Sequence, residues 1–118
     1  IIRIGGITEA RKISAMAEAF DIKTAWHGPN DVSPVTHAVN WHMNVSSYHF
    51  GIQEDGTVDD TVKEVVHGGP VCRNGYLVMP DLPGIGCDID EEAAARYPYQ
   101  RAYIPVCRRT SDGSLCDW

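Results

Sequence analysis

Three side chains that could take part in chemistry follow two short apolar segments of this sequence. His27 and Asp31 lie in the stretch WHGPND, and Glu54 ends the stretch FGIQE. Imidazole exchanges its proton near neutral pH, which suits histidine for binding polar substrates and for proton transfer. A carboxylate that ends an apolar strand is costly unless it is paired or used. We therefore interpret these three residues as candidates for one functional site.

The residues around these candidates predict strands that alternate with helices. A helical stripe of apolar residues runs from Ile13 to Phe20, and Ser33 with Pro34 is a good start for a helix that continues to about Met43. Such alternation is typical of a parallel sheet with right-handed crossovers. Three short apolar runs are expected to be its buried strands: Ile1–Ile4, Ile22–Trp26 and Ser47–Gln53.

Parallel strands bring the residues that follow them to one edge of a sheet, where α/β proteins build their sites. We therefore expect three stretches to converge at one edge of the sheet: Gly5–Gly6, His27–Asp31 and Gln53–Asp55. Three strands are too few to bury both faces of a parallel sheet, and a closed (β/α)₈ barrel needs roughly 250 residues. The expected fold class is α/β, and we expect this chain to be the end of a larger α/β domain.

The second half of the chain has a different pattern, rich in turn signals. We expect two parts, residues 1–56 with the alternating pattern and residues 57–118 as a separate carboxyl-terminal segment. The stretch VCRNGYLVM predicts a hairpin over residues 71–79, because Asn74–Gly75 suits a type I′ turn. Two short helices are also expected, over residues 61–66 and 91–97, the second capped by Asp90.

Composition narrows the classes of partner. The chain has 118 residues, the size of one small domain, and 43% of them are hydrophobic, which is normal for a globular protein. Its formal net charge of −6 argues against nucleic acid or an anionic membrane as a partner, because binding phosphates needs clustered positive charge. No apolar run approaches the roughly 18 residues that span a bilayer.

Cysteine and histidine spacing predicts neither a zinc site nor a redox motif. No cysteine pair has C-x-x-C spacing, and the alternatives are two disulfides in a secreted protein or reduced thiols in a cytoplasmic one, which we favour. His37 and His42 are five residues apart on a helix and point to different sides, so with His49 they are expected to be surface or hydrogen-bonded core residues. The four cysteines are Cys72, Cys87, Cys107 and Cys116.

Four motifs together resemble a known protein family. In chain order they are GGITEARKI, TAWHGPNDVSPVTHA, FGIQE and GYLVMPDLPGIGCDID. They resemble the carboxyl-terminal part of the D-mannonate dehydratase family of the enolase superfamily, and H-G-P-x-D followed at this separation by G-I-Q-E is a specific combination. The resemblance implies a TIM-type (β/α) barrel whose last three strands lie in this chain, followed by a hairpin-rich carboxyl-terminal segment.

The resemblance implies acid-sugar chemistry. Family members abstract the proton alpha to the carboxylate of acids such as D-mannonate or D-gluconate, and loss of water gives a 2-keto-3-deoxy acid. A Mg²⁺ ion stabilises the intermediate, because an alpha proton beside a carboxylate is very weakly acidic. The implied partners are a sugar acid, the remainder of the protein's own barrel with its capping domain, and further copies in a homo-oligomer.

By the same resemblance, this chain supplies substrate contacts, and the catalytic groups lie elsewhere. His27, Asp31 and Glu54 match residues that contact substrate oxygens in the family. The family's three acidic Mg²⁺ ligands, its tyrosine base and its histidine acid lie on earlier strands, outside this sequence. Pro29 stands where the more active mannonate dehydratases tend to carry alanine. Two alternatives therefore stay open: another acid-sugar dehydratase or racemase of the superfamily, and a non-catalytic regulator that binds a sugar acid.

Overall fold

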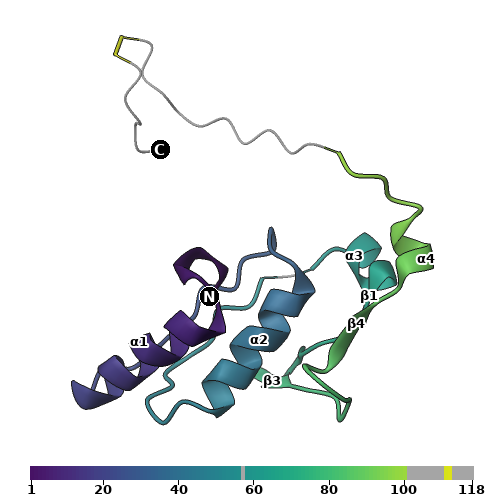
Figure 1. Cartoon of the computed structure of the whole chain (residues 1–118). Coiled ribbons are helices and arrows are strands. Elements are labelled where there is room, and N and C mark those ends of the chain that lie inside the picture. Colours follow the sequence, from purple (N-terminus) through teal and green to yellow (C-terminus); the bar gives the residue numbers. More distant parts are fainter. Residues whose placement is uncertain (57, 101–110, 113–118) are drawn as a thin grey trace.

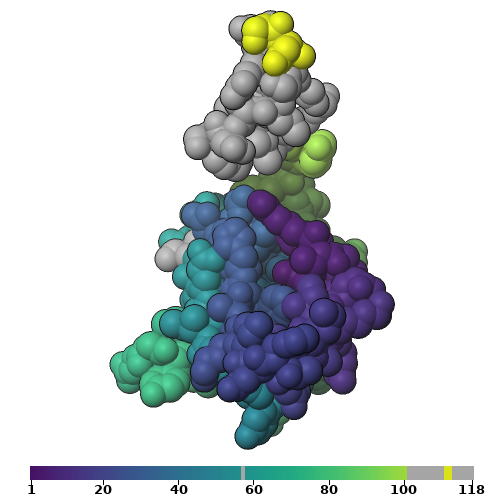
Figure 2. All heavy atoms as spheres, turned by 90° about the vertical axis from the view of Figure 1, so that its left-hand side faces the viewer, coloured from purple at the N-terminus to yellow at the C-terminus, as the bar shows by residue number. Residues whose placement is uncertain are grey.

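The computed structural model describes residues 1–56, 58–100 and 111–112. Two helices, α1 (Ile7–Ala19) and α2 (Pro34–Val45), pack against each other, and a group of short elements lies on the other side of α2 (Figure 1). Figure 2 shows the face on which α1, in purple, and α2, in blue, meet. Where they meet, Ala10, Trp26 and Met43 form a small core, with Ile1 and Val39 packed against it.

The helix predicted after Ser33 is confirmed. Its first turn is capped by the Ser33 Oγ atom, which accepts a hydrogen bond from the Val35 N–H at 3.3 Å, and Pro34 occupies the first helical position. Serine before proline suits this place because the hydroxyl satisfies a free backbone N–H and proline has none to satisfy. The helix ends at Val45, two residues beyond the expected end at Met43.

The strand predicted at Ile1–Ile4 is wrong. Residues Ile2–Ile4 form a short 3₁₀ helix, η1, and Gly5 ends it in the left-handed region with φ 96°. The Ile4 N–H and the Gly6 N–H both donate to the Ile1 carbonyl oxygen, at 3.1 and 3.3 Å. A strand needs hydrogen bonds to a neighbouring strand. Within the described residues this segment makes none, and it closes on itself instead.

The other two predicted strands are reduced to a single pair. Thr24 and Phe50 form an isolated parallel bridge, in which the Thr24 N–H donates to the His49 carbonyl and the Gly51 N–H donates to the Thr24 carbonyl, both at 2.9 Å. Their parallel direction agrees with the prediction, but regular strands over residues 22–26 and 47–53 are not formed. Parallel strands are stable in sheets covered on both faces, and among the described residues each segment has only the other beside it. At the coarser level, the described residues contain both helices and strands, with one parallel bridge, which agrees with the predicted α/β class.

The predicted hairpin is confirmed and is slightly shorter than expected. Strands β2 (Val71–Arg73) and β3 (Tyr76–Val78) pair antiparallel, with Arg73 opposite Tyr76. Asn74 and Gly75 between them have φ values of 52° and 80°, the positive pair that a type I′ turn requires.

The remaining elements form a second small unit around an unpredicted strand pair. Strands β1 (Val66–Gly68) and β4 (Cys87–Ile89) pair antiparallel, far apart in the sequence. Helix α3 (Asp60–Val65) leads into β1, one residue offset from its predicted range. Helix α4 (Glu91–Ala94) follows β4 and is shorter than expected, but Asp90 caps it as predicted, accepting from the Ala93 N–H at 2.8 Å.

Two side chains of α2 form hydrogen bonds to the second half of the chain. Trp41 Nε1 donates to the Leu77 carbonyl oxygen at 3.0 Å, and His42 Nε2 donates to the Ile85 carbonyl at 3.2 Å. Helix α2 therefore contacts α1 on one side and the later strands on the other.

Three further properties concern membrane spans, thiols and exposed apolar surface. Helices in the described part of the chain are all too short or too polar to cross a membrane. Cys72 and Cys87 are free thiols, and Cys107 and Cys116 lie outside the described residues. Large apolar side chains are exposed around α1 and the bridge, for example Phe20, Ile22 and Ile52.

Candidate functional site

The structure brings His27 and Glu54 together. The His27 Nε2 atom lies 3.4 Å from Glu54 Oε2, although the two residues are far apart in the sequence. The same carboxylate oxygen accepts a hydrogen bond from the Gly28 N–H at 3.3 Å. Both side chains remain about half exposed, at 58% and 57%, so a small molecule can reach them. The pair sits where the two parallel segments end, as expected for this edge of an α/β structure.

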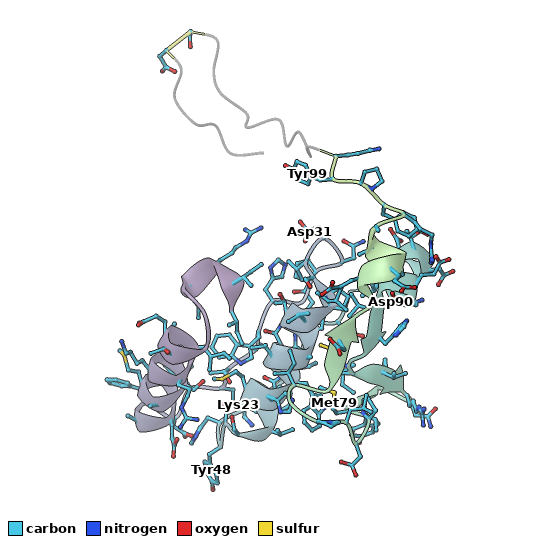
Figure 3. The ribbon with its side chains drawn as sticks, turned by 45° about the vertical axis from the view of Figure 1, so that its right-hand side comes forward. Lys23, Asp31, Tyr48, Met79, Asp90 and Tyr99 are labelled. Atoms are coloured by element: carbon cyan, nitrogen blue, oxygen red, sulfur yellow. The ribbon has the colours of Figure 1, made fainter. Side chains whose placement is uncertain are left out.

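Asp31 occupies the crest of the same loop. Figure 3 shows it above the first turn of α2, at the opposite end of the molecule from Lys23 and Tyr48. Its side chain is exposed and makes no hydrogen bond or ion pair within the described part of the chain. The structure thus places Asp31 on the loop that carries His27, but it does not join Asp31 to the His27–Glu54 pair.

The backbone of the His27 loop is held from two sides. Four successive carbonyl oxygens, those of residues 26 to 29, each accept a hydrogen bond. The donors come from two elements that flank the loop, α2 and the segment around Glu54. They are Gln53 Nε2 to Trp26 at 2.8 Å, Asn40 Nδ2 to His27 at 3.1 Å, the Gly56 N–H to Gly28 at 2.6 Å, and His37 Nε2 to Pro29 at 3.1 Å.

His37 confirms the expectation of a hydrogen-bonded core histidine. Its side chain is only 5% exposed, and a carbonyl oxygen can only accept, so Nε2 carries the proton that bonds Pro29. Its other ring nitrogen, Nδ1, lies 3.7 Å from the Asp55 Oδ1 atom. His37 therefore connects the loop to the segment that follows Glu54.

Sequence reasoning missed Asn40 as a part of this site. Asn40 is completely buried on α2, and its side-chain oxygen has no partner in the described residues. The available signal was its spacing, because residues 37 and 40 are three apart and so lie on one helix face. Two polar residues on a face that packs against a loop indicate hydrogen bonds to that loop.

A small cavity opens beside the loop. It has a volume of about 160 Å³, and His27 and Arg3 are the two charged or chargeable side chains in its wall. A larger cavity of about 330 Å³ lies between α2 and the β2–β3 turn, away from His27, and has a mainly apolar lining. The smaller one is lined by Ile1, Ile2, Arg3, Ile4, Trp26, His27, Pro29, Val32 and Thr36.

The site as described does not fit a metal ion. Nowhere in residues 1–56, 58–100 and 111–112 do three or more histidine, cysteine, aspartate or glutamate side chains gather in a way that could hold one. The arrangement instead suits hydrogen bonding to a polar ligand, because the His27 imidazole lines an accessible cavity and the Glu54 carboxylate lies beside that imidazole.

Comparison with known proteins identifies relatives over most of the chain. Residues 1–93 match the family described as "Enolase C-terminal domain-like". A D-galactonate dehydratase family member from Enterococcus gallinarum is 44% identical over 115 residues, covering 97% of this chain and 27% of the relative. A D-mannonate dehydratase from Caulobacter vibrioides is 41% identical over 118 residues, covering 100% of this chain and 29% of the relative. The chain thus spans less than a third of the length of these curated relatives.

A solved structure supports the same relationship. The crystal structure of an enolase from Pantoea ananatis, with bound D-gluconate and magnesium, superposes with a TM-score of 0.78 at 43% sequence identity. The match covers 84% of this chain and 24% of that one. The resemblance seen in the four sequence motifs is therefore confirmed.

Proposed function

The chain belongs to the enolase C-terminal domain-like family, and on that basis we propose that the protein containing it removes water from a sugar acid to give a 2-keto-3-deoxy acid. D-Mannonate, D-gluconate and D-galactonate are the first candidate substrates. The relatives' names include D-galactonate and D-mannonate dehydratase, and the Pantoea ananatis structure holds D-gluconate. The single observation in this chain that carries the proposal is the half-exposed His27–Glu54 pair at 3.4 Å.

In this proposal, His27 and Glu54 bind and orient the substrate. A sugar acid presents a row of hydroxyl groups that both donate and accept hydrogen bonds. Glu54 accepts from a hydroxyl, while the His27 imidazole donates to or accepts from another, depending on its tautomer. Asp31, exposed at the crest of the loop, is the third proposed contact with a substrate hydroxyl.

The remaining chemistry is assigned outside this chain. Mg²⁺ would supply positive charge to stabilise the intermediate, as the magnesium in the Pantoea ananatis structure suggests for the family. The described residues do not provide a metal site, so we place its ligands, the base and the acid in the preceding part of the protein. That part would complete the TIM-type barrel and its capping domain, with residues 1–56 as the last strands and helices of the barrel and residues 57–118 as the terminal segment.

We also propose a homo-oligomer in the cytoplasm. Reduced thiols, which we favour for the four cysteines of the sequence, fit this compartment. Size-exclusion chromatography with light scattering on the full-length protein tests the oligomer directly.

The decisive experiment incubates the full-length protein with Mg²⁺ and a panel of sugar acids. We expect a 2-keto-3-deoxy product, detected by mass spectrometry as loss of one water, and no product when EDTA removes the metal. An epimerised acid of unchanged mass would favour a racemase, and binding by calorimetry without any product would favour a regulator. Either result, or no binding at all, would overturn the dehydratase proposal.

A further inference from the structure

His27 itself has little to fix its direction. Its side chain is more than half exposed, and the only side chain that it pairs with in the described residues is Glu54, at 3.4 Å. A group that orients a substrate must be held within a narrow range of positions, and small displacements are costly. The restraint on His27 must therefore act mainly through its backbone.

Asn40 contacts the backbone of His27 directly. Its Nδ2 atom donates to the carbonyl oxygen of His27, across 13 residues of sequence, from a fully buried position on α2. The bond fixes the peptide plane that follows the His27 Cα atom. Its neighbours on either side are held too, by Gln53 at Trp26 and by Gly56 at Gly28.

The chemistry of Asn40 indicates a purpose other than stability. An amide buried with one hydrogen bond still leaves its oxygen unpaired among the described residues, which is unfavourable. An apolar residue of similar volume, such as leucine, would fill the same space without that penalty. What leucine lacks is the N–H group that bonds the His27 carbonyl.

We propose that Asn40 is a positioning residue for His27, which acts by holding the carbonyl oxygen of that residue from α2. This inference rests on the proposed function for its effect on substrate. Its effect on the loop can be measured without any substrate.

The test compares two variants of the full-length protein that each lose one N–H donor of α2. Asn40→Leu removes the bond to His27. The matched control, Trp41→Phe, removes the bond from Trp41 Nε1 to Leu77, on the neighbouring residue of the same helix but remote from the loop. Asn40→Ala serves as a second variant if leucine prevents folding.

Two measurements read the result. Hydrogen–deuterium exchange of peptides covering residues 26–33 should become roughly tenfold faster in Asn40→Leu and stay unchanged in Trp41→Phe. With a sugar acid as substrate, kcat/KM should fall roughly tenfold to a hundredfold in Asn40→Leu, mostly through kcat, and change little in the control.

The outcomes separate the two proposals. If wild-type protein neither binds nor converts any sugar acid, the proposed function fails and the exchange experiment alone decides on Asn40. If Asn40→Leu and Trp41→Phe show equal exchange over residues 26–33, Asn40 is only a structural residue and the inference is overturned, whatever the activity.

Discussion

At the scale of single residues, the His27–Glu54 pair is too exposed to contribute much to stability. With both side chains more than half exposed, such a pair contributes about 0–1 kcal/mol, because water screens the charges and two side chains must be ordered. Its value therefore has to be sought in binding.

We predict that His27→Gln separates stability from function. The free energy of unfolding should change by less than about 1 kcal/mol, while kcat/KM for the sugar acid falls roughly tenfold to a hundredfold, because the flexible glutamine amide does not hold a hydrogen-bonding group where the imidazole holds its own. Chemical denaturation and steady-state kinetics of the full-length protein measure the two effects.

A second histidine–carboxylate pair provides the control for that variant. His49 Nε2 lies 2.9 Å from Asp21 Oδ1, at the Thr24–Phe50 bridge and away from the loop of residues 27–31. His49→Gln should leave kcat/KM close to the wild-type value. A loss of activity as large as that of His27→Gln would mean that the site extends as far as the bridge.

The thiols allow a prediction from charge and burial. Burial, and then the neighbouring Asp88 carboxylate, raise the pKa of the Cys87 thiol above its ordinary value, so less of it is the reactive thiolate at pH 8. Cys72 is exposed. Iodoacetamide at pH 8 should therefore label the Cys72 peptide before the Cys87 peptide, as followed by mass spectrometry over time, and labelling of Cys87 should accelerate as pH rises. Faster labelling of Cys87 than of Cys72 at pH 8 would contradict this.

At the scale of secondary-structure elements, the helices, the turns and the β2–β3 hairpin were predictable from the sequence, and the three parallel strands were not. Ser33 and Asp90 cap their helices as expected, and Asn74–Gly75 forms the expected turn. Each of these depends on bonds between residues a few positions apart. The segments at residues 1–4, 22–26 and 47–53 depend instead on neighbouring strands, and apolar composition alone does not supply them.

The candidate site was likewise predictable from the sequence only in part. The pairing of His27 with Glu54 follows from placing both at the ends of parallel segments, and the structure brings them together. The spacing of Asn40 and His37 puts both on one helix face, but it does not predict their bonds to the loop carbonyls. They depend on how α2 turns its face toward the loop, which local sequence does not determine. The roles of His27, Asp31 and Glu54 toward substrate stay predictions.

The β2–β3 turn gives a stability prediction. Gly75 has φ of 80° and an added Cβ would meet nothing within 4 Å, so any cost of substitution is conformational. Gly75→Val should lower the free energy of unfolding by about 1–2 kcal/mol, because β-branched residues avoid positive φ. Gly75→Asn should cost much less, since asparagine tolerates this region, and denaturant melts of both variants of the full-length protein measure the difference. Equal losses would show that the strain is not in the backbone.

The start of α2 gives a second stability prediction. Ser33→Ala removes the Oγ acceptor for the Val35 N–H and should cost about 1 kcal/mol of unfolding free energy. Ser33→Asp keeps an acceptor and places negative charge at the helix N-terminus, so it should retain the wild-type stability or exceed it. Thermal denaturation of the two variants of the full-length protein side by side tests this, and a Ser33→Asp protein as unstable as Ser33→Ala would rule out the cap as the cause.

At the scale of the whole molecule, too little apolar surface is buried for independent stability. Five apolar side chains are buried among the described residues, and three of them are alanines, whereas nineteen large apolar side chains are exposed. Exposed apolar area of this extent is typical of a surface that another polypeptide segment covers. The preceding part of a longer protein is the occupant we expect.

We therefore predict that these 118 residues, expressed alone, self-associate and show no cooperative thermal transition. Sedimentation velocity and circular dichroism melts measure both properties. The full-length protein is the comparison, and it should melt cooperatively with the same residues in place. A monomeric 118-residue chain with a sharp transition would show that the small core around Trp26 suffices.

The four bonded carbonyls of residues 26 to 29 have a consequence for protein engineering. They hold main-chain oxygens, which every amino acid carries, so the path of the loop does not depend on the side chains it displays. Positions 27 and 31 should therefore accept many different amino acids in a randomised library while most clones still fold. A library built at positions 37 and 40 should lose folded clones far more often, which makes the loop the better place to select new substrate preferences.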